Sequence, residues 1–288
     1  MRQLLVIIAL CPLVHGQTFK SALDQVAVPI TIHRGPGNPA VDFGPEDFRV
    51  FDDGRPVPIV SFGRVRQSVH VLLLLDTSRS MIESLSQVQS AAGKVITQLE
   101  PHDSIQVGTF SSVLRLSPAF SADDGNLATR LPVIPGGNMT ILYDALLEGC
   151  GTFTNEMERR AIFVVSDGLD TASLASAVSV MQRAAESNVA IYAVGLAGRT
   201  TQRGDSVSRA PDPTLRTIAE DTGGRYAFGG AGGDFPNVLG FMMEELHQQY
   251  LLGFTPAVAD GRLHSLVVTT RHPNTSIRAR KHYWAPLP

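Results

Sequence analysis

The residues best able to do chemistry follow one strongly apolar segment. Residues 71–75 read Val-Leu-Leu-Leu-Leu, and Asp76-Thr77-Ser78-Arg79-Ser80 comes directly after them. The pattern is typical of a buried strand that stops at an acid and two serines. Oxygen side chains at alternate positions suit a hard divalent cation, because Mg²⁺ prefers oxygen ligands and retains waters beside them. A strand end followed by a helix N-cap at Ser78 or Ser80 would produce the same residues.

Two further segments place oxygen groups at comparable positions. Thr140 follows the glycines of 136–137 at the start of a predicted helix, where capping is the other interpretation. Asp167 lies in Ser166-Asp167-Gly168 after the apolar run 161–165, and this tripeptide is also typical of a turn. Ligands of open α/β sheets bind at the carboxyl ends of the strands. The three segments together therefore predict a site built from three loops at one sheet edge.

The elements that must position these groups alternate between strands and helices from about residue 70 to 250. Apolar runs at 71–75, 105–110, 161–165 and 189–196 predict parallel strands buried on both faces. Helical spacing is clearest at 81–99, and weaker at 141–152, 174–187, 213–221 and 235–249. The alternation predicts an α/β fold with a Rossmann-like, doubly wound, mostly parallel sheet.

Short β-like segments flank this region on both sides. The N-terminal ones are 26–32, 48–51 and 58–62, of which the last two flank the turn Asp52-Asp53-Gly54 and are expected to form a hairpin. The C-terminal ones are 250–254, 263–270 and 276–281. Because three strands alone are marginally stable, we expect the two sets to pair into a small β-domain. The predicted division is an N-terminal β segment at 17–66, the α/β domain at 67–250 and a C-terminal β segment at 251–288.

The first residues have the composition of a cleavable secretory signal. Arg2 precedes an apolar stretch of 11 residues at 4–14, and Gly16 offers a small residue at the cleavage point. The stretch is shorter than the roughly 20 residues that a membrane-spanning helix needs. We therefore expect residues 1–16 to be a signal peptide and the mature protein to be periplasmic or extracellular, without a membrane span. Cys150 is then the only cysteine, which we expect to be a buried apolar residue.

Composition excludes several classes of protein. The 288 residues are 43% hydrophobic with a formal net charge of −3, which excludes disorder and collagen. The 24 Lys and Arg residues against 27 Asp and Glu residues give no overall basic field, so no nucleic-acid partner is expected.

Enzyme motifs are absent from the sequence. It contains no Gly-x-Ser-x-Gly, His-Glu-x-x-His, Gly-x-x-x-x-Gly-Lys or Cys-x-x-Cys, and its eight histidines are scattered. A metal-assisted hydrolase would need a general base, for which Asp170 is the one candidate near the acidic loops. We therefore expect a binding protein and no enzymatic activity.

Residues 76–80 resemble the D-x-S-x-S signature of von Willebrand factor A (VWA) domains. Thr140 and Asp167 match the threonine and aspartate of the metal-ion-dependent adhesion site of that family, and the resemblance covers about residues 67–250. The flanks at 46–54, 249–254 and 278–281 are similar to exported VWFA-related proteins of acidobacterial type.

The resemblance implies a metal site with named ligands. Ser78, Ser80 and Thr140 would reach a divalent cation, and Asp76 and Asp167 would bind it directly or through water. Mg²⁺ is the expected cation, with Mn²⁺ and Ca²⁺ open. An Asp or Glu carboxylate from a partner protein would complete the coordination, which makes the chain an exported adhesion module.

Two residues near this site are open to more than one interpretation. Asp144 follows the family pattern and could accept a hydrogen bond from a serine hydroxyl or bound water behind the ligands, or only cap its helix. Arg79 stands where glycine is frequent in the family, and it could lower metal affinity, attract an acidic partner or only face solvent. The alternative function is a metal-independent structural or scaffold protein of the cell envelope with a vestigial metal site.

Overall fold

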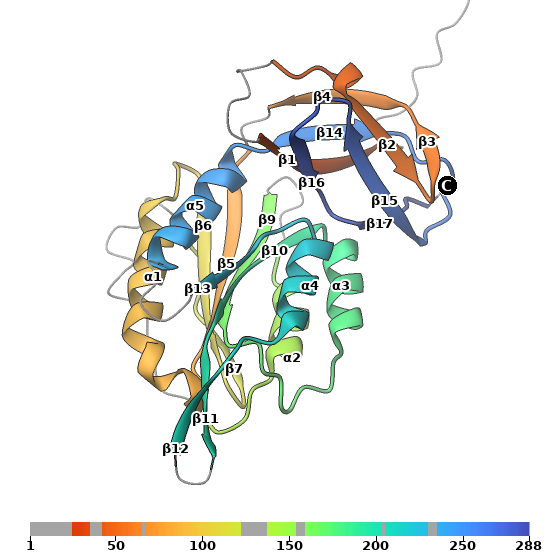
Figure 1. Cartoon of the computed structure of the whole chain (residues 1–288). Helices are drawn as coiled ribbons and strands as arrows, with labels where there is room; N and C mark the ends of the chain where they lie inside the picture. The colour runs from red at the N-terminus through yellow and green to blue at the C-terminus, as the bar shows by residue number, and fades with distance from the viewer. Residues whose placement is uncertain are drawn as a thin grey trace, which may run out of the picture.

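The protein folds into an α/β domain with a smaller β-domain packed against one end (Figure 1). In this computed structural model the structure describes residues 25–34, 42–64, 67–121, 137–153, 159–202, 205–229 and 235–287. The predicted signal peptide at 1–16 lies outside these residues.

A seven-stranded sheet forms the centre of the α/β domain, in the order β13-β10-β9-β5-β6-β7 with β8 also paired to β6. Parallel pairing joins β5 (Val69–Asp76), β6 (Ser104–Phe110), β9 (Arg159–Ser166), β10 (Val189–Leu196) and β13 (Tyr226–Gly229). The short strands β7 (Leu114–Leu116) and β8 (Phe120–Ser121) are antiparallel to β6. The four predicted strands are confirmed, and they are the central ones because only strands covered on both faces give continuous apolar runs.

Helices cover both faces of the sheet (Figure 1). Val71, Leu73 and Leu75 pack toward the face of α1 (Leu85–Thr97) and α5 (Phe235–His247). Leu72 and Leu74 pack toward the opposite face, which α2 (Leu142–Cys150), α3 (Ala177–Glu186) and α4 (Pro213–Asp221) cover. All five of these strand residues have no exposed surface. This arrangement confirms the predicted doubly wound fold.

The start of the first helix differs from the prediction. The helical spacing begins at Met81, but the chain first forms the 3₁₀ segment η3 (Arg79–Ser84) and becomes α-helical at Leu85. No side chain caps the N-terminus of α1. The Ser78 and Ser80 hydroxyls just before it face each other instead, and the Asp76 carboxylate accepts from the Ser78 backbone N–H, as described below.

The β-domain is built from both ends of the chain, as predicted. One sheet has the order β16-β1-β14-β4, and the other has the order β17-β15-β2-β3. The N-terminal region supplies β1 (Val26–Arg34), β2 (Phe48–Asp52), β3 (Arg55–Val57) and β4 (Ile59–Arg64), with the 3₁₀ turn η2 (Pro45–Asp47) before β2. The C-terminal region supplies β14 (Tyr250–Phe254), β15 (Leu263–Thr270), β16 (Thr275–Arg278) and β17 (His282–Trp284). Their apolar side chains share one core cluster.

The predicted hairpin between 48–51 and 58–62 is wrong in its second strand. Asp53 and Gly54 adopt positive φ angles of 46° and 76°, so the chain reverses at once and β2 pairs with β3. Pro58 then lies between β3 and β4, and β4 joins the other sheet beside β14. Pro58 has no N–H to donate and adds no ladder hydrogen bond between the two strands.

The β-domain lies at the amino ends of the parallel strands (Figure 1). The buried Arg159 guanidinium, at the start of β9, donates to the carbonyl oxygens of Leu246 and Gln249 at the end of α5. The Gln249 amide donates to the hydroxyls of Thr31 in β1 and Tyr192 in β10. These hydrogen bonds connect the two domains at one edge, and the predicted site lies at the other.

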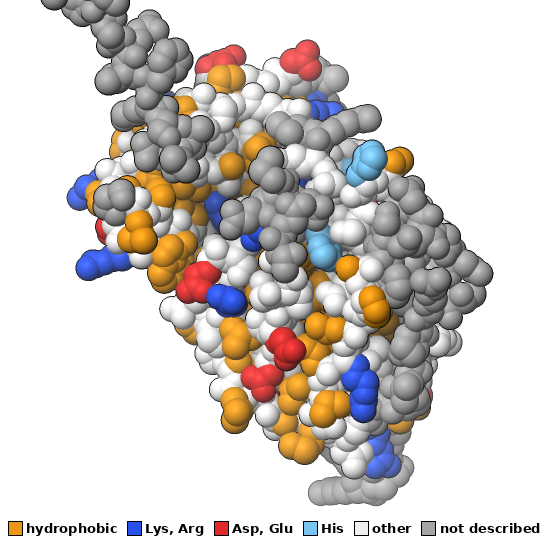
Figure 2. Space-filling model, turned by 180° about the vertical axis from the view of Figure 1, so that it is seen from behind, with side chains coloured by type: hydrophobic (Ala, Val, Ile, Leu, Met, Phe, Trp, Pro, Cys, Tyr) orange, Lys and Arg blue, Asp and Glu red, His pale blue; other side chains and the backbone are white. Residues whose placement is uncertain are grey.

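The rear face of the molecule carries charges of both signs (Figure 2). Lys and Arg side chains on that face are scattered among acidic, polar and apolar ones. Among the described residues, none of the helices combines the length and the apolar character needed to span a membrane.

We expect the stability of the α/β domain to depend on Asp103, at the amino edge of the central sheet. Its buried carboxylate accepts hydrogen bonds of 2.8 Å from the backbone N–H groups of Val69 and Glu100, and its Oδ2 lies 2.8 Å from Nε2 of His247. Asp103→Ala leaves buried donors without an acceptor and should lower the free energy of unfolding by about 2–3 kcal/mol. Urea unfolding measures this loss. Asp103→Asn retains one acceptor oxygen and should lose less, whereas equal stability of Asp103→Ala and the wild type would contradict the assignment.

Candidate metal centre

The predicted site lies where the order of the central strands reverses. From β5 the chain passes to β6 on one side, and it later returns to β9 on the other side of β5. The carboxyl ends of β5 and β9 are therefore neighbours, and they carry Asp76 and Ser166. Such a reversal opens a crevice at the carboxyl edge of the sheet.

Asp76 is fully buried at the end of β5 and bonded on both carboxylate oxygens. Its Oδ1 accepts from the Ser78 backbone N–H at 2.8 Å, and its Oδ2 accepts from the Ser166 hydroxyl at 2.6 Å. Burial raises the pKa of Asp76 to about 6, while the hydrogen bonds from Ser166 and Ser78 oppose the rise and the nearby Asp167 carboxylate adds to it. Two acids thus lie close together inside the protein.

The two serine hydroxyls of the first loop face each other. Ser78 Oγ lies 3.2 Å from Ser80 Oγ, with Ser78 buried and Ser80 half-buried. Thr77 fixes the loop to the end of β6, because its backbone N–H and its hydroxyl both donate to the Phe110 carbonyl, at 2.9 and 3.1 Å. Arg79, between the serines, is exposed.

Thr140 reaches the same edge from the start of α2. It is 3% exposed, and its backbone N–H donates to the Thr171 hydroxyl at 2.8 Å. Its carbonyl accepts from the N–H groups of Thr171 and Ala172, at 2.9 and 3.1 Å. The second loop is therefore bonded to the third, just beyond Asp167.

Asp167 is fully buried in the third loop. Its Oδ1 accepts from the Leu169 N–H at 3.0 Å, and Gly168 has a φ of 77° that a residue with a side chain rarely adopts. A Cβ at position 198 would overlap the Asp167 carboxylate, so Gly198 is required there. Gly198 begins the hairpin of β11 (Gly198–Gln202) and β12 (Asp205–Arg209), which extends from this edge of the molecule (Figure 1).

Comparison with known proteins agrees with this geometry. Residues 70–233, more than half of the chain, match the model of the von Willebrand factor type A domain. The chain belongs to the VWA family. None of the curated proteins matches it.

Solved structures similar to this VWA protein come from several organisms. A von Willebrand factor type A protein from Catenulispora acidiphila is 12% identical with a TM-score of 0.51, over 93% of this chain and 76% of that one. Proximal thread matrix protein 1 from the mussel byssus is 13% identical with a TM-score of 0.51, over 64% and 49%. An aerotolerance-related membrane protein from Bacteroides fragilis is 18% identical with a TM-score of 0.50, over 62% and 100%. At these identities the similarity shows the fold alone.

Two further acids of the VWA domain hold its loops. The Asp144 carboxylate accepts from the backbone N–H groups of Leu174 and Ala175, at 3.0 and 2.8 Å, and so fixes the segment before α3. Asp170 accepts from the Ser173 hydroxyl at 2.6 Å and from the Tyr143 N–H at 3.3 Å. These hydrogen bonds join α2 to the segment between β9 and α3 that follows Asp167.

Sequence reasoning missed the role of Ser166. Its hydroxyl donates to Asp76 and accepts from the Gly168 N–H at 3.0 Å, so it links the first loop to the third. The sequence signal was a serine at the end of a buried strand, one residue before Asp167. A serine followed by an aspartate and a glycine is also typical of a turn, so the signal alone did not reveal this role. The β11–β12 hairpin was missed as well, because its residues are polar and lack an apolar period.

Ser166→Ala should raise the pKa of Asp76. The Ser166 hydrogen bond favours the ionised carboxylate, so its removal should move the pKa of Asp76 from about 6 to a higher value in protein freed of divalent cations. Carboxyl-carbon NMR titration measures both values. An Asp76 pKa that is the same or lower in the variant would show that Ser166 does not stabilise the charge.

Proposed function

We propose that this VWA domain is a protein-binding module that acts through a divalent cation. Ser78, Ser80 and Thr140 supply hydroxyl ligands, while Asp76 and Asp167 bind the cation directly or through water. An Asp or Glu carboxylate of a partner protein completes the coordination. The observation that carries the proposal is the pair of fully buried acids, Asp76 and Asp167, lying beside these hydroxyls at the reversal point of the sheet.

The negative charge of the proposed ligands fits a hard cation. Burying two carboxylates close together is costly unless positive charge compensates them. Among the described residues, no Lys or Arg forms an ion pair with Asp76, and its hydrogen bonds come from Ser78 and Ser166. A divalent cation at this edge would stabilise both acids in their ionised form.

The ligand chemistry favours Mg²⁺, with Mn²⁺ and Ca²⁺ as the alternatives. All five proposed ligands offer oxygen, which hard cations prefer. When bound, the cation supplies a positive centre that an incoming carboxylate can coordinate. The neutral hydroxyls leave this charge only partly balanced, and the hydrogen bonds that fix Asp76 and the Thr140 backbone hold the donors in place beforehand.

The surface around the site supports a protein partner. Ile82 and Met139, each within two residues of a proposed ligand, expose 48% and 51% of their surface, and Leu174 exposes 99%. Leu174 is held near α2 through the hydrogen bond from its N–H to Asp144. These apolar side chains beside the proposed ligands offer contact surface to a protein partner. Arg79 adds an exposed positive charge that favours an acidic partner. The partner surface we propose is therefore a carboxylate bordered by apolar side chains.

Binding, and not catalysis, accounts best for these residues. VWA domains are typically adhesion or interaction modules. Asp170, the one candidate base from the sequence, has a carboxylate engaged by Tyr143 and Ser173. Export remains a prediction from residues 1–16, and with it we propose a partner outside the cytoplasm.

Thermal unfolding tests the cation. After removal of metal with EDTA, Mg²⁺ or Mn²⁺ at ten times its dissociation constant should stabilise the protein by about 1.4 kcal/mol, which raises Tm by roughly 3–6 °C. Asp76→Ala should lose this shift, whereas Glu186→Gln, an exposed acid on α3, should retain it. The absence of a shift in the wild type would favour the metal-independent structural role.

Glutarate, a small dicarboxylate, tests whether the bound cation keeps one coordination position open for a partner carboxylate. In Mn²⁺-loaded protein a small dicarboxylate that displaces a metal-bound water should lower the water proton relaxation rate, and Asp76→Ala should show no such decrease. An equal decrease in both proteins would mean that the carboxylate acts on Mn²⁺ bound elsewhere.

A further inference from the structure

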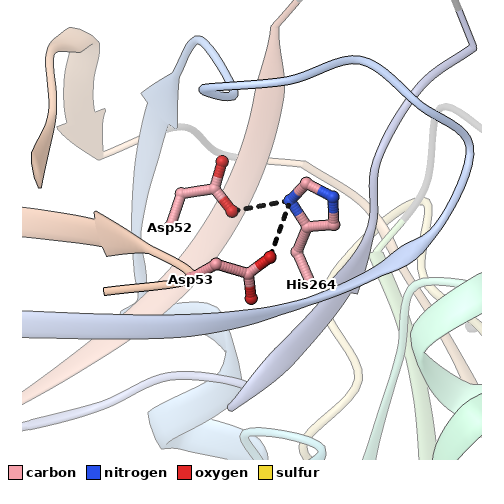
Figure 3. A group of neighbouring side chains, drawn as sticks. All are labelled: Asp52, Asp53 and His264. Carbon is pink, nitrogen blue, oxygen red and sulfur yellow. Dashed lines mark hydrogen bonds and ion pairs between the residues drawn. The ribbon is translucent and has the colours of Figure 1, made fainter. Parts of the chain in front are cut away.

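We propose that the β-domain contains a second metal site, of the Zn²⁺ type, formed by Asp52, Asp53 and His264. Figure 3 shows the two carboxylates turned toward the His264 ring. Nδ1 of His264 lies 2.7 Å from Oδ1 of Asp52 and 3.7 Å from Oδ2 of Asp53, and one ligand atom from each residue lies within 4.8 Å of the others. Zn²⁺ binds carboxylate oxygen and imidazole nitrogen at about 2.0–2.2 Å, so a single ion can reach all three once Nδ1 of His264 and Oδ1 of Asp52 move apart from hydrogen-bond distance to the wider spacing of tetrahedral ligands.

Hydrogen bonds orient each of the two carboxylates. Oδ2 of Asp52 accepts from the Ala257 N–H at 2.8 Å, which leaves Oδ1 facing His264. Oδ1 of Asp53 accepts from the N–H and the hydroxyl of Ser265, at 2.8 and 3.1 Å, which leaves Oδ2 on the same side. One oxygen of each acid is thus fixed by the surrounding chain, and the other points toward the proposed ion.

The far nitrogen of His264 also has a carboxylate partner. Nε2 lies 3.1 Å from Oδ1 of Asp260. When Nε2–H donates to Asp260, Nδ1 presents its lone pair toward Asp52 and Asp53, and a metal ion bound between them can accept that lone pair. Metal-binding histidines commonly donate their second N–H to a carboxylate in this way.

The cluster carries enough negative charge to hold a divalent ion in place of a proton at Nδ1. Three carboxylates surround one imidazole, so even a protonated His264 leaves two negative charges in excess. Within the described part of the chain, no Lys or Arg is ion-paired to Asp52, Asp53 or Asp260. The Asp52 and His264 side chains are 1% and 7% exposed, whereas that of Asp53 is 55% exposed and gives the ion a route from solvent.

A metal here would connect the two ends of the chain. Asp52 and Asp53 lie at the β2–β3 turn, and His264 lies in β15, 212 residues beyond Asp52. The buried Tyr283 hydroxyl of β17 lies 3.3 Å from Nδ1 and borders the same space. The ion would thus join strands of both chain ends in one sheet, which is a structural role separate from the partner-binding edge.

Zinc titration of the full-length Asp76→Ala protein tests this site apart from the first one. Isothermal titration calorimetry should give one Zn²⁺ per chain, and Zn²⁺ should raise Tm. Asp53→Asn added to Asp76→Ala should weaken Zn²⁺ binding by about tenfold or more. Asp53 is the chosen position because it is exposed, and an asparagine there keeps an acceptor for Ser265.

His282→Asn in the same Asp76→Ala protein is the matched control. His282 also pairs with an acid in this part of the molecule, Asp221, and its loss should leave Zn²⁺ affinity unchanged. X-ray absorption spectroscopy at the zinc edge should show that the bound Zn²⁺ has one imidazole nitrogen among oxygen ligands. Failure of the Asp76→Ala protein to bind Zn²⁺, or equal affinity after Asp53→Asn, would overturn the proposal and identify His264 as a protonated partner of Asp52.

Discussion

The hydrogen bond from the Ser166 hydroxyl to the fully buried Asp76 carboxylate joins the ends of the two central strands, and the candidate site is built around it. It exists because β9 lies directly beside β5, with Leu75 opposite Val165 in the register. The same acid accepts the Ser78 N–H and so sets the path of the first loop. Placing a second buried acid, Asp167, close to this one creates an electrostatic constraint that hydroxyl donors alone only partly relieve. We interpret the site as a set of oxygen ligands that a bound cation would complete by balancing the charge of the two acids.

The two edges of the central seven-stranded sheet have different roles. At the amino edge, Arg159 and Gln249 connect the last helix and the sheet to a β-domain assembled from both chain ends. At the carboxyl edge, loops held by their own hydrogen bonds present oxygen donors and exposed apolar side chains such as Leu174. The chain thus fixes one end of the VWA domain within the molecule and leaves the other facing outward. A metal at His264 would strengthen the fixed end and leave the binding edge unchanged.

Sequence patterns predicted most where burial dictates residue type. The bounds of β10, α4 and β14 agree with the predicted runs at 189–196, 213–221 and 250–254, because a buried strand leaves a continuous apolar run and a helix with one buried face leaves a periodic one. The pattern failed where tertiary contacts decide. Gly198 is explained only by the Asp167 carboxylate beside it, and the Asp144 carboxylate contacts residues 30 and 31 positions away. The pairing of Asp52 with His264 spans 212 positions, a distance that no local pattern encodes.

The most direct test of the account is to locate Mn²⁺ by its paramagnetic effect on the amide NMR signals of metal-free protein. A cation held by the three loops should broaden the signals of Ser78, Thr140 and Asp167 together, at Mn²⁺ concentrations well below that of the protein. Asp76→Ala should retain these signals under the same conditions. Persistence of the Ser78, Thr140 and Asp167 signals in the wild type at saturating Mn²⁺ would contradict a cation at this edge, whatever other signals are lost.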